Sequence, residues 1–414
     1  MRLKISKYGA LITVLRFSMA VMFIAAGRID AGAALCHTPS FPQDSIEVIR
    51  VRDTVQKRMN VWRKIYHYFA DANVKKDKRL DISVIGGPHY SSDTKLGLGL
   101  VAAGVYNTHR GDSITPESNI SLFGDITTTG FWLLGVRGNN IFYAAKWRID
   151  YTAYFFSFPS GFWGIGYTLG DSDDNACKYM RHQAEFKSDF MFSVAQNLYI
   201  GPSVGFRFIS GANFTENNLG IGGEEMLNSA DRITRYASTG AALTYDSRDF
   251  IPNAYKGVYF NFVQRIFTDF SHKPFFSTDM TFDVYKVAWK GAIFAFDANT
   301  VLQYGPGDVP WTMKTTLGGS NRLRGYYDGR YRDDNSLQLQ VEYRQKIYNR
   351  HGIVLWGGCG TIWSKNESFK WKNILPNYGV GYRWEFKKRM NVRLDYGFGK
   401  NGQSSFLFSI NEAF

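Results

Sequence analysis

The chain contains few residue patterns that could carry out chemistry, and the one that resembles a catalytic motif is weak. Gly201, Ser203 and Gly205 match the G-x-S-x-G pattern of a serine nucleophile. That pattern works at a sharp turn between a strand and a helix. Here it lies inside a continuing strand pattern, and no histidine is tied to it by spacing. We therefore expect no catalytic residues, and a chain that is not an enzyme.

Metal and cofactor sites are not indicated either. The acidic stretch 171–175 could offer oxygen ligands to Ca²⁺, but it lacks the rest of a calcium-binding loop, so we interpret it as a solvated external turn. Cys36, Cys177 and Cys359 allow at most one disulfide bridge and have no metal-site spacing. The sequence predicts isolated thiols, no metal and no cofactor.

The most informative polar side chain is Arg324, in a long connection that also carries glycines at 318, 319, 325 and 329. Glycines let such a connection bend sharply enough to fold back into a pore. The planar guanidinium of an arginine binds a carboxylate through two hydrogen bonds and stacks on aromatic rings. Arg324 therefore needs an acidic partner, which the surrounding elements must supply.

Those elements have the pattern of transmembrane β-strands. From residue 81 onward, segments of about ten residues alternate apolar and polar side chains. In LQLQVEYR, residues 337–344, Glu342 lies on the polar face, and in VRLDYGFG, residues 392–399, Asp395 does. After residue 33 no apolar stretch is long enough for a spanning helix. Only a closed barrel could then cross a membrane, because backbone groups in lipid must be hydrogen-bonded internally.

The predicted fold is therefore all-β, a transmembrane antiparallel β-barrel of about sixteen strands. The strands are expected at 81–91, 95–107, 118–128, 131–138, 142–157, 179–194, 198–210, 235–247, 257–267, 277–289, 292–305, 336–349, 352–363, 375–386, 391–400 and 404–414. We place 158–178 in one external loop instead of giving 162–168 a strand, because the long connections then all lie outside and both termini lie in the periplasm.

The N-terminal region is predicted to precede the barrel. Residues 1–33 have the charged start, apolar stretch and small-residue site of a cleaved signal peptide. A lipoprotein signal ending at Cys36 and a membrane anchor are weaker alternatives. Residues 34–80 would form a periplasmic segment with an amphipathic helix at 44–72. That helix could pack under or inside the barrel, dock a partner, or lie on anionic lipid, which the formal net charge of +13 would suit.

Three segments, in order along the chain, resemble the barrel half of outer-membrane assembly factors of the BamA/TamA type, also described as bacterial surface antigen barrels. Residues 314–335 contain the element Leu323, Arg324, Gly325, Tyr326, similar to the family's [V/L]-R-G-[F/Y] element. Residues 243–257 resemble its internal hairpin with Asp-Arg-Asp, Pro and Gly, and the segments around 378–386 and 392–399 resemble its closing strands. The resemblance extends from about residue 81 to residue 414.

The resemblance implies a re-entrant external loop that folds back into the lumen. It favours Glu342 as the partner of Arg324, with Asp395 as the second candidate. An exposed basic loop is the alternative. The chain departs from the family pattern at Gly358, where relatives often have an aspartate, and this removes one expected acceptor. It also resembles a short branch without POTRA modules, because 34–80 is too short to hold one.

The sequence thus predicts a barrel that inserts or translocates proteins or lipids at a weak seam between its first and last strands. The seam candidates are Gly86, Gly87 and Pro88, since proline lacks a donor for strand pairing, and Phe414, whose strand resembles a C-terminal aromatic insertion signal. A passive channel is the main alternative, and a surface enzyme is a remote one. Expected partners are outer-membrane lipids, periplasmic or lipoprotein partners and a client protein, but no nucleic acid. The substrate and the oligomeric state stay open.

Overall fold

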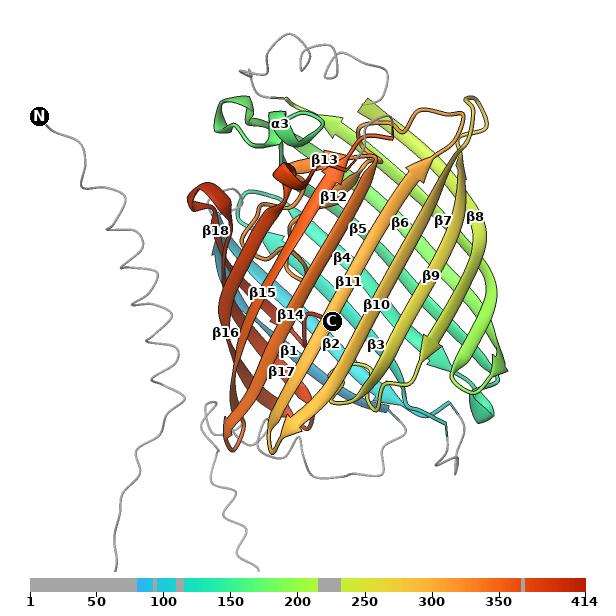
Figure 1. Cartoon of the computed structure of the whole chain (residues 1–414), viewed down its shortest axis with the longest axis vertical. Helices are drawn as coiled ribbons and strands as arrows, with labels where there is room; N and C mark the ends of the chain where they lie inside the picture. The colour runs from blue at the N-terminus through green and yellow to red at the C-terminus, as the bar shows by residue number, and fades with distance from the viewer. Residues whose placement is uncertain (1–79, 92–94, 109–114, 215–231, 366–368) are drawn as a thin grey trace, which may run out of the picture. The chain divides into compact units, whose positions relative to one another are not determined.

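A single antiparallel sheet of sixteen strands makes up most of the structure. The computed structural model describes residues 80–91, 95–108, 115–214, 232–365 and 369–414. Each strand pairs with its neighbour in chain order, β11 pairs with β14, and the sheet is rolled into a barrel (Figure 1). The all-β barrel predicted from the sequence is confirmed.

The strands of the barrel are β1 (Leu80–Ser91), β2 (Lys95–Tyr106), β3 (Ser118–Thr127), β4 (Trp132–Ile141), β5 (Trp147–Phe162), β6 (Cys177–Ala195), β7 (Leu198–Ala212), β8 (Ile233–Asp246), β9 (Gly257–Thr268), β10 (Phe275–Trp289), β11 (Ala292–Tyr304), β14 (Asn335–Tyr348), β15 (His351–Trp363), β16 (Leu375–Lys387), β17 (Met390–Phe398) and β18 (Ser404–Ile410). A separate short hairpin, β12 (Thr315–Leu317) and β13 (Tyr331–Asp333), lies in the connection between β11 and β14.

The two faces of the sheet are the reverse of those in a soluble protein. On β14, Val341 is 47% exposed, whereas Gln340 is 3% and Glu342 is 0% exposed. On β6, the exposed Phe186 likewise follows the buried Glu185. The apolar face is therefore turned toward lipid and the polar face lines the lumen, as expected for a barrel that crosses a membrane.

Three strand boundaries differ from the prediction by four residues or more. The expected start of β5 is occupied by the helical turn η1 (Tyr143–Ala145), in which Ala144 has a left-handed φ of 54°, so the strand begins at Trp147. The last strand, expected to reach 414, ends at Ile410 because Asn411 adopts a φ of 67° and turns the chain. The loop expected at 158–178 is shorter, because β5 runs on to Phe162 and β6 begins at Cys177; the remaining stretch 163–176 contains no strand.

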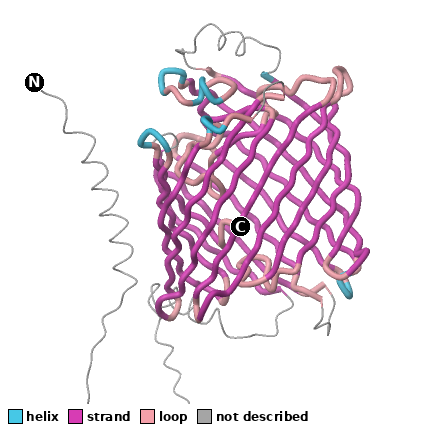
Figure 2. Tube along the Cα trace, viewed as in Figure 1, coloured by secondary structure: helices cyan, strands magenta, loops and turns pink. Residues whose placement is uncertain are grey.

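Helical structure is confined to short connecting segments of the described residues (Figure 2). They include α3 (Tyr167–Gly170), η2 (Asp173–Asn175), η4 (Trp371–Asn373) and η5 (Lys400–Gly402). No helix among the described residues is both long and apolar enough to span a bilayer. The predicted signal peptide, the helix at 44–72 and Cys36 lie outside the described residues.

The two ends of the sheet meet as an overlap. The strand order begins at β1 and ends at β18, and within the described residues no ladder joins these two strands. Instead, Val101 and Ala103, on the lumen-facing side of β2, share a buried apolar cluster with the C-terminal strands. The members from those strands are Trp384, Phe386, Met390, Val392 and Ile410. Val392 and Ile410 are register partners on the outward face of β17 and β18. The last strands therefore pass inside the first hairpin at this point, and we call this contact the lap joint.

Candidate functional site

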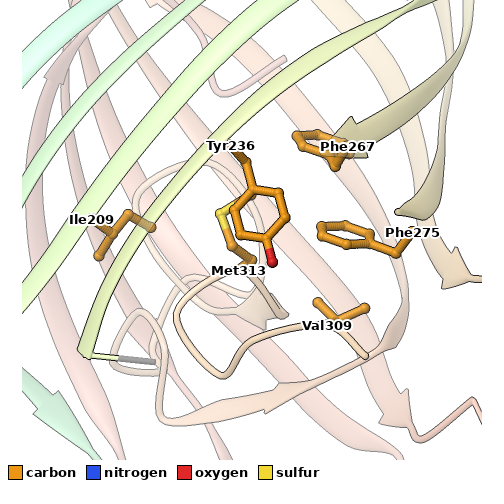
Figure 3. Packing of buried hydrophobic residues seen from close by; sticks show 6 residues of the cluster. All are labelled: Ile209, Tyr236, Phe267, Phe275, Val309 and Met313. Atoms are coloured by element: carbon orange, nitrogen blue, oxygen red, sulfur yellow. The ribbon is translucent and has the colours of Figure 1, made fainter. Parts of the chain in front are cut away.

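The connection between β11 and β14, residues 305–334, is packed inside the barrel. Val309 and Met313 lie against wall residues of β7 to β10 (Figure 3). The cluster consists of Ile209, Tyr236, Phe267, Phe275, Val309 and Met313. Trp311 joins a second cluster that includes Phe162 and Tyr179. The connection is thus packed against the inner wall of the barrel, and the alternative of an exposed basic loop is wrong. We call residues 305–334 the re-entrant loop.

Arg324 lies at the tip of the re-entrant loop with 0% of its surface exposed. Its Nη1 donates to Asp395 Oδ2 on β17 at 2.8 Å, and its Nη2 donates to Glu342 Oε1 on β14. The guanidinium carbon stands 3.8 Å from the ring centre of Trp356 on β15. The structure therefore brings the loop motif together with both acids named from the sequence, so that one planar cation bridges two strands that are not neighbours in the sheet.

Glycines make room for the tip. Gly325 has a φ of +120°, a conformation that side chains disfavour, and a Cβ there would lie 2.8 Å from the Phe398 backbone. On the facing β17, a Cβ at Gly397 would stand 2.5 Å from the Arg324 carbonyl oxygen. A Cβ at Gly360 on β15 would stand 2.2 Å from Leu323. The wall strands thus have glycine at the positions where residues 323–326 lie against them.

At Gly358, where the family pattern often has an aspartate, the structure leaves no room for a side chain. Asn377 on β16 donates from Nδ2 to the Arg324 carbonyl oxygen at 3.3 Å. A Cβ at Gly358 would lie 2.9 Å from Asn377 Oδ1 and 2.4 Å from the Leu339 carbonyl oxygen. A side chain at 358 would therefore clash with the strand beside it and crowd Asn377. Trp356 and Asn377 line this part of the pocket around Arg324.

Tyr326 fastens the other side of the motif. Its hydroxyl donates to the Pro376 carbonyl oxygen at 2.6 Å and accepts from the Lys400 backbone N–H at 2.7 Å. Its ring occupies the space next to Gly399, where a Cβ would be 2.7 Å away. Burial raises the pKa of Tyr326 to about 12, so the hydroxyl keeps its proton and remains a donor.

A second arginine of the loop, Arg322, was not singled out from the sequence. It makes two short contacts to Asp297 on β11, with Nε to Oδ2 at 2.8 Å and Nη2 to Oδ1 at 2.6 Å. Gln340 also donates to Asp297, at 3.1 Å. The sequence does show Asp297 on the polar face of 292–305. That acid alone gives no reason to pair it with Arg322 instead of another basic residue of the loop.

The acidic stretch 171–175 holds the outer part of the re-entrant loop. Asp173 pairs with Arg330 at 2.6 Å, and Asp171 accepts from the Tyr331 hydroxyl at 3.1 Å. Lys400 also reaches Asp171, at 3.1 Å. The prediction of a merely solvated turn missed these contacts, because their partners lie far away in the sequence. Within the described residues, no group of acids, cysteines and histidines has an arrangement that could hold a metal ion.

The remaining candidates fall into two groups. Gly86, Gly87 and Pro88 lie within β1 and face Leu100, Gly99 and Leu98 of β2 in the ladder. Phe414 was expected in the last strand, and this is wrong. Its ring lies 6.1 Å from that of Tyr285 on β10, inside the barrel, because the chain turns inward at Asn411.

Ser203 and the two described cysteines have ordinary structural roles. The Ser203 hydroxyl donates to Asp189 and accepts from Arg265 at 2.8 Å, which leaves it in a polar network on the wall. Cys177 is a buried free thiol, and Cys359 is a partly buried one.

These features define an outer-membrane β-barrel whose lumen holds a loop tied down by buried cation–carboxylate contacts. The family model of the Omp85 superfamily domain matches residues 138–414. The chain belongs to the Omp85 superfamily.

Comparison with solved structures supports the same fold. BamA from Haemophilus ducreyi, in a form lacking POTRA domains 1–3, matches with a TM-score of 0.50 and 12% identity over 80% of this chain and 70% of that one. CdiB from Acinetobacter baumannii matches with a TM-score of 0.51 and 10% identity, over 81% of this chain and 60% of that one. CdiB from Escherichia coli gives 0.53 and 10%, over 81% and 63%. The matched part thus spans less than two thirds of each CdiB chain. Among curated proteins, none matches the sequence.

Proposed function

We propose that this barrel inserts proteins into the outer membrane, or moves proteins or lipids across it, through the seam between β1 and β18. The observation that carries the proposal is the lap joint, because strands that pair by a full ladder would have to break many backbone hydrogen bonds to part. Here side-chain packing takes the place of that ladder. Pro88 in β1 further weakens strand pairing at this edge, because a proline has no backbone N–H to donate to a neighbouring strand.

The occupied lumen argues against a passive channel. A pore needs a continuous aqueous path, whereas the re-entrant loop buries Arg324, Arg330 and Arg332 between the walls. Its apolar clusters would have to come apart before solutes could pass. The lock formed by Leu323, Arg324, Gly325 and Tyr326 with Glu342 and Asp395 would hold the loop while the seam works. This role needs no catalytic residue and no cofactor.

Partners follow from where such a barrel would act. Outer-membrane lipids would contact its apolar face, and a client protein would meet the seam. A periplasmic or lipoprotein partner would be needed to deliver that client. A cleaved signal peptide at 1–33 and a periplasmic segment at 34–80 fit this route to the membrane.

A reversible staple across the lap joint tests the proposal. Ala103→Cys and Ile410→Cys, in a chain whose native cysteines are replaced, would join members of one buried cluster. Proteoliposomes carrying this variant would receive an unfolded barrel client, and insertion would be followed by the client's heat-modifiable gel mobility. Oxidation should stop insertion and reduction should restore it. A parallel assay with a fluorescent phospholipid asks whether lipid is the substrate.

The matched control places cysteines at Val84 and Ala102, which are register partners within the first hairpin. That staple leaves the seam free and should leave insertion unchanged. Full insertion by the oxidised 103–410 variant would contradict the proposal. A steady ion conductance in planar bilayers that ignores the staple would instead favour the passive channel.

A further inference from the structure

The charged groups around Arg324 continue beyond the re-entrant loop. Glu342 Oε2 accepts from Arg344 Nε at 2.8 Å, on the side opposite to Arg324. Asp395 Oδ1 accepts from Arg383 Nη1 at 2.6 Å, while its Oδ2 holds Arg324. Each acid of the lock therefore has a second arginine from the barrel wall, and Asp395 Oδ2 also lies 3.6 Å from Arg393 Nε on β17.

Glu412 joins those two arginines. Its Oε2 accepts from Arg383 Nε at 2.8 Å and lies 3.9 Å from Arg344 Nε. The ring of alternating charges therefore closes. In order it runs through Arg324, Glu342, Arg344, Glu412, Arg383 and Asp395. All six side chains are at most 6% exposed, so the charges depend on one another and not on water.

Glu412 reaches the ring because the chain leaves β18. The turn at Asn411 is fixed by a hydrogen bond from its N–H to the Asn391 carbonyl oxygen at 2.7 Å. Asn391 Nδ2 also donates to Glu412 Oε1 at 2.7 Å. Further along, the Phe414 backbone oxygen accepts from Arg344 at 3.1 Å. Residues 411–414, here called the tail, are thus bound to the same arginines that support the lock.

We propose that Glu412 is a positioning residue that couples the re-entrant loop to the last strand. Releasing the tail leaves Arg344 and Arg383 without one of their acids. These arginines then draw on Glu342 and Asp395 alone, and the hold on Arg324 weakens. In the reverse direction, loss of Arg324 weakens the hold on the tail and on β18. The loop and the seam therefore open together. This last consequence rests on the proposed function, whereas the coupling itself does not.

Trypsin cleavage tests the coupling without any activity assay. Arg330 and Arg332 are 6% and 2% exposed in the docked loop, so cleavage there reports loop release. In the full chain folded in detergent, Glu412→Gln should raise the cleavage rate at these sites by about tenfold or more, in line with the coupling energies of residues that share one network. Heat-modifiable migration shows in the same sample that the barrel is folded.

The matched control is Glu385→Gln. Glu385 is also an acid near this end of the barrel, with an ion pair to Lys346 at 2.5 Å, but it is not a member of the ring. Cleavage of this variant should stay within about twofold of the wild type, as expected for a pair whose lysine is 47% exposed. In an Arg324→Ala chain, adding Glu412→Gln should change the rate little, because the ring is already broken.

Equal cleavage of folded Glu412→Gln and wild-type chains would overturn the coupling, as would fully additive effects of Arg324→Ala and Glu412→Gln. If Glu412→Gln does not fold, Phe414→Ala loosens the tail at its other contact and is judged by the same criterion. Normal coupling in a chain that neither inserts clients nor moves lipid would instead contradict the proposed function and leave the ring intact.

Discussion

Two sides of the barrel interior satisfy the same kinds of charges in different ways. On β5 to β7, Glu185 accepts from Tyr154 at 2.6 Å and pairs with Arg207 and Lys187, all of which belong to the wall itself. On β14 to β17, Glu342 and Asp395 receive Arg324 from the re-entrant loop. The re-entrant loop packs apolar residues against both sides, but the charge of Glu185 is matched by the wall alone, whereas Glu342 and Asp395 also take a cation from the loop. The charges of the β14–β17 side are therefore the ones that depend on the position of the re-entrant loop.

The largest expected effect comes from Arg324→Ala. Glu342 and Asp395 keep Arg344 and Arg383, but each acid loses one of its buried cationic partners, and breaking a buried ion pair typically costs about 3–5 kcal/mol. The docking free energy of the loop should fall by that order, as measured by trypsin cleavage at Arg330 and Arg332, while the barrel stays folded. A double-mutant cycle with Glu342→Gln should be strongly non-additive. Additive effects with unchanged cleavage would mean that the two residues act independently.

Arg324→Lys should give an intermediate result. An ammonium keeps the charge, but it cannot reach Asp395 and Glu342 as a planar fork or stack on Trp356 in the same way. Loop cleavage should fall between that of the wild type and Arg324→Ala. A lysine variant as protected as the wild type would show that charge alone, without the fork geometry, holds the loop.

Gly397→Ala is expected to cost about 1–3 kcal/mol of loop docking, because its Cβ would press on the Arg324 carbonyl oxygen at 2.5 Å. The matched control is Gly357→Ala on β15, where a Cβ would meet only the Asn377 carbonyl oxygen at 4.0 Å. Cleavage of the loop in each folded variant gives the comparison. Similar cleavage in the two would argue against a close fit of the tip to β17.

The self-sufficient side should respond less and only locally. Glu185→Gln removes hydrogen bonds to charged groups, but the Lys187 and Arg207 side chains are 37% and 22% exposed and can be solvated instead. We expect a loss of about 1 kcal/mol in the free energy of unfolding by urea in lipid vesicles. Loop cleavage should not change. If the loop were released, the two sides would be linked and the contrast between them would be lost.

The smallest effect is expected for Lys346→Met. The Lys346 side chain is 47% exposed, so its pair with Glu385 should contribute at most about 1 kcal/mol. Unfolding in urea, repeated at high salt, checks this value. A loss as large as that of Arg324→Ala would show that even exposed pairs at this end support the loop.

The sequence carried most of the fold because strand alternation is a local property. Val341, Glu342 and their neighbours alternate regardless of what lies across the barrel, so the strands could be placed to within a few residues. Arg324 could be matched to Glu342 and Asp395 because few acids lie on polar strand faces near the closing strands. The resemblance to a known family narrowed that choice further.

What could not be predicted depends on contacts between distant segments. The need for glycine at 360 and 397 can be recognised only when the loop is seen to lie against β15 and β17. Arg322 and Asp297 show no mutual signal in the sequence. The strand pattern also continues through residue 414, and nothing local in it marks Asn411 as the point where the chain turns inward.

The lap joint also gives the seam a direction. Because the first hairpin lies outside the last strands there, the opening proposed above would move β1 and β2 away from the barrel axis, and Trp384 and Phe386 would oppose movement toward it. An outward swing uncovers apolar side chains toward the surrounding lipid. Hydrocarbon tails are as apolar as those side chains, so parting the joint costs far less in a bilayer than in water. The surrounding lipid would therefore lower the free-energy cost of the proposed opening.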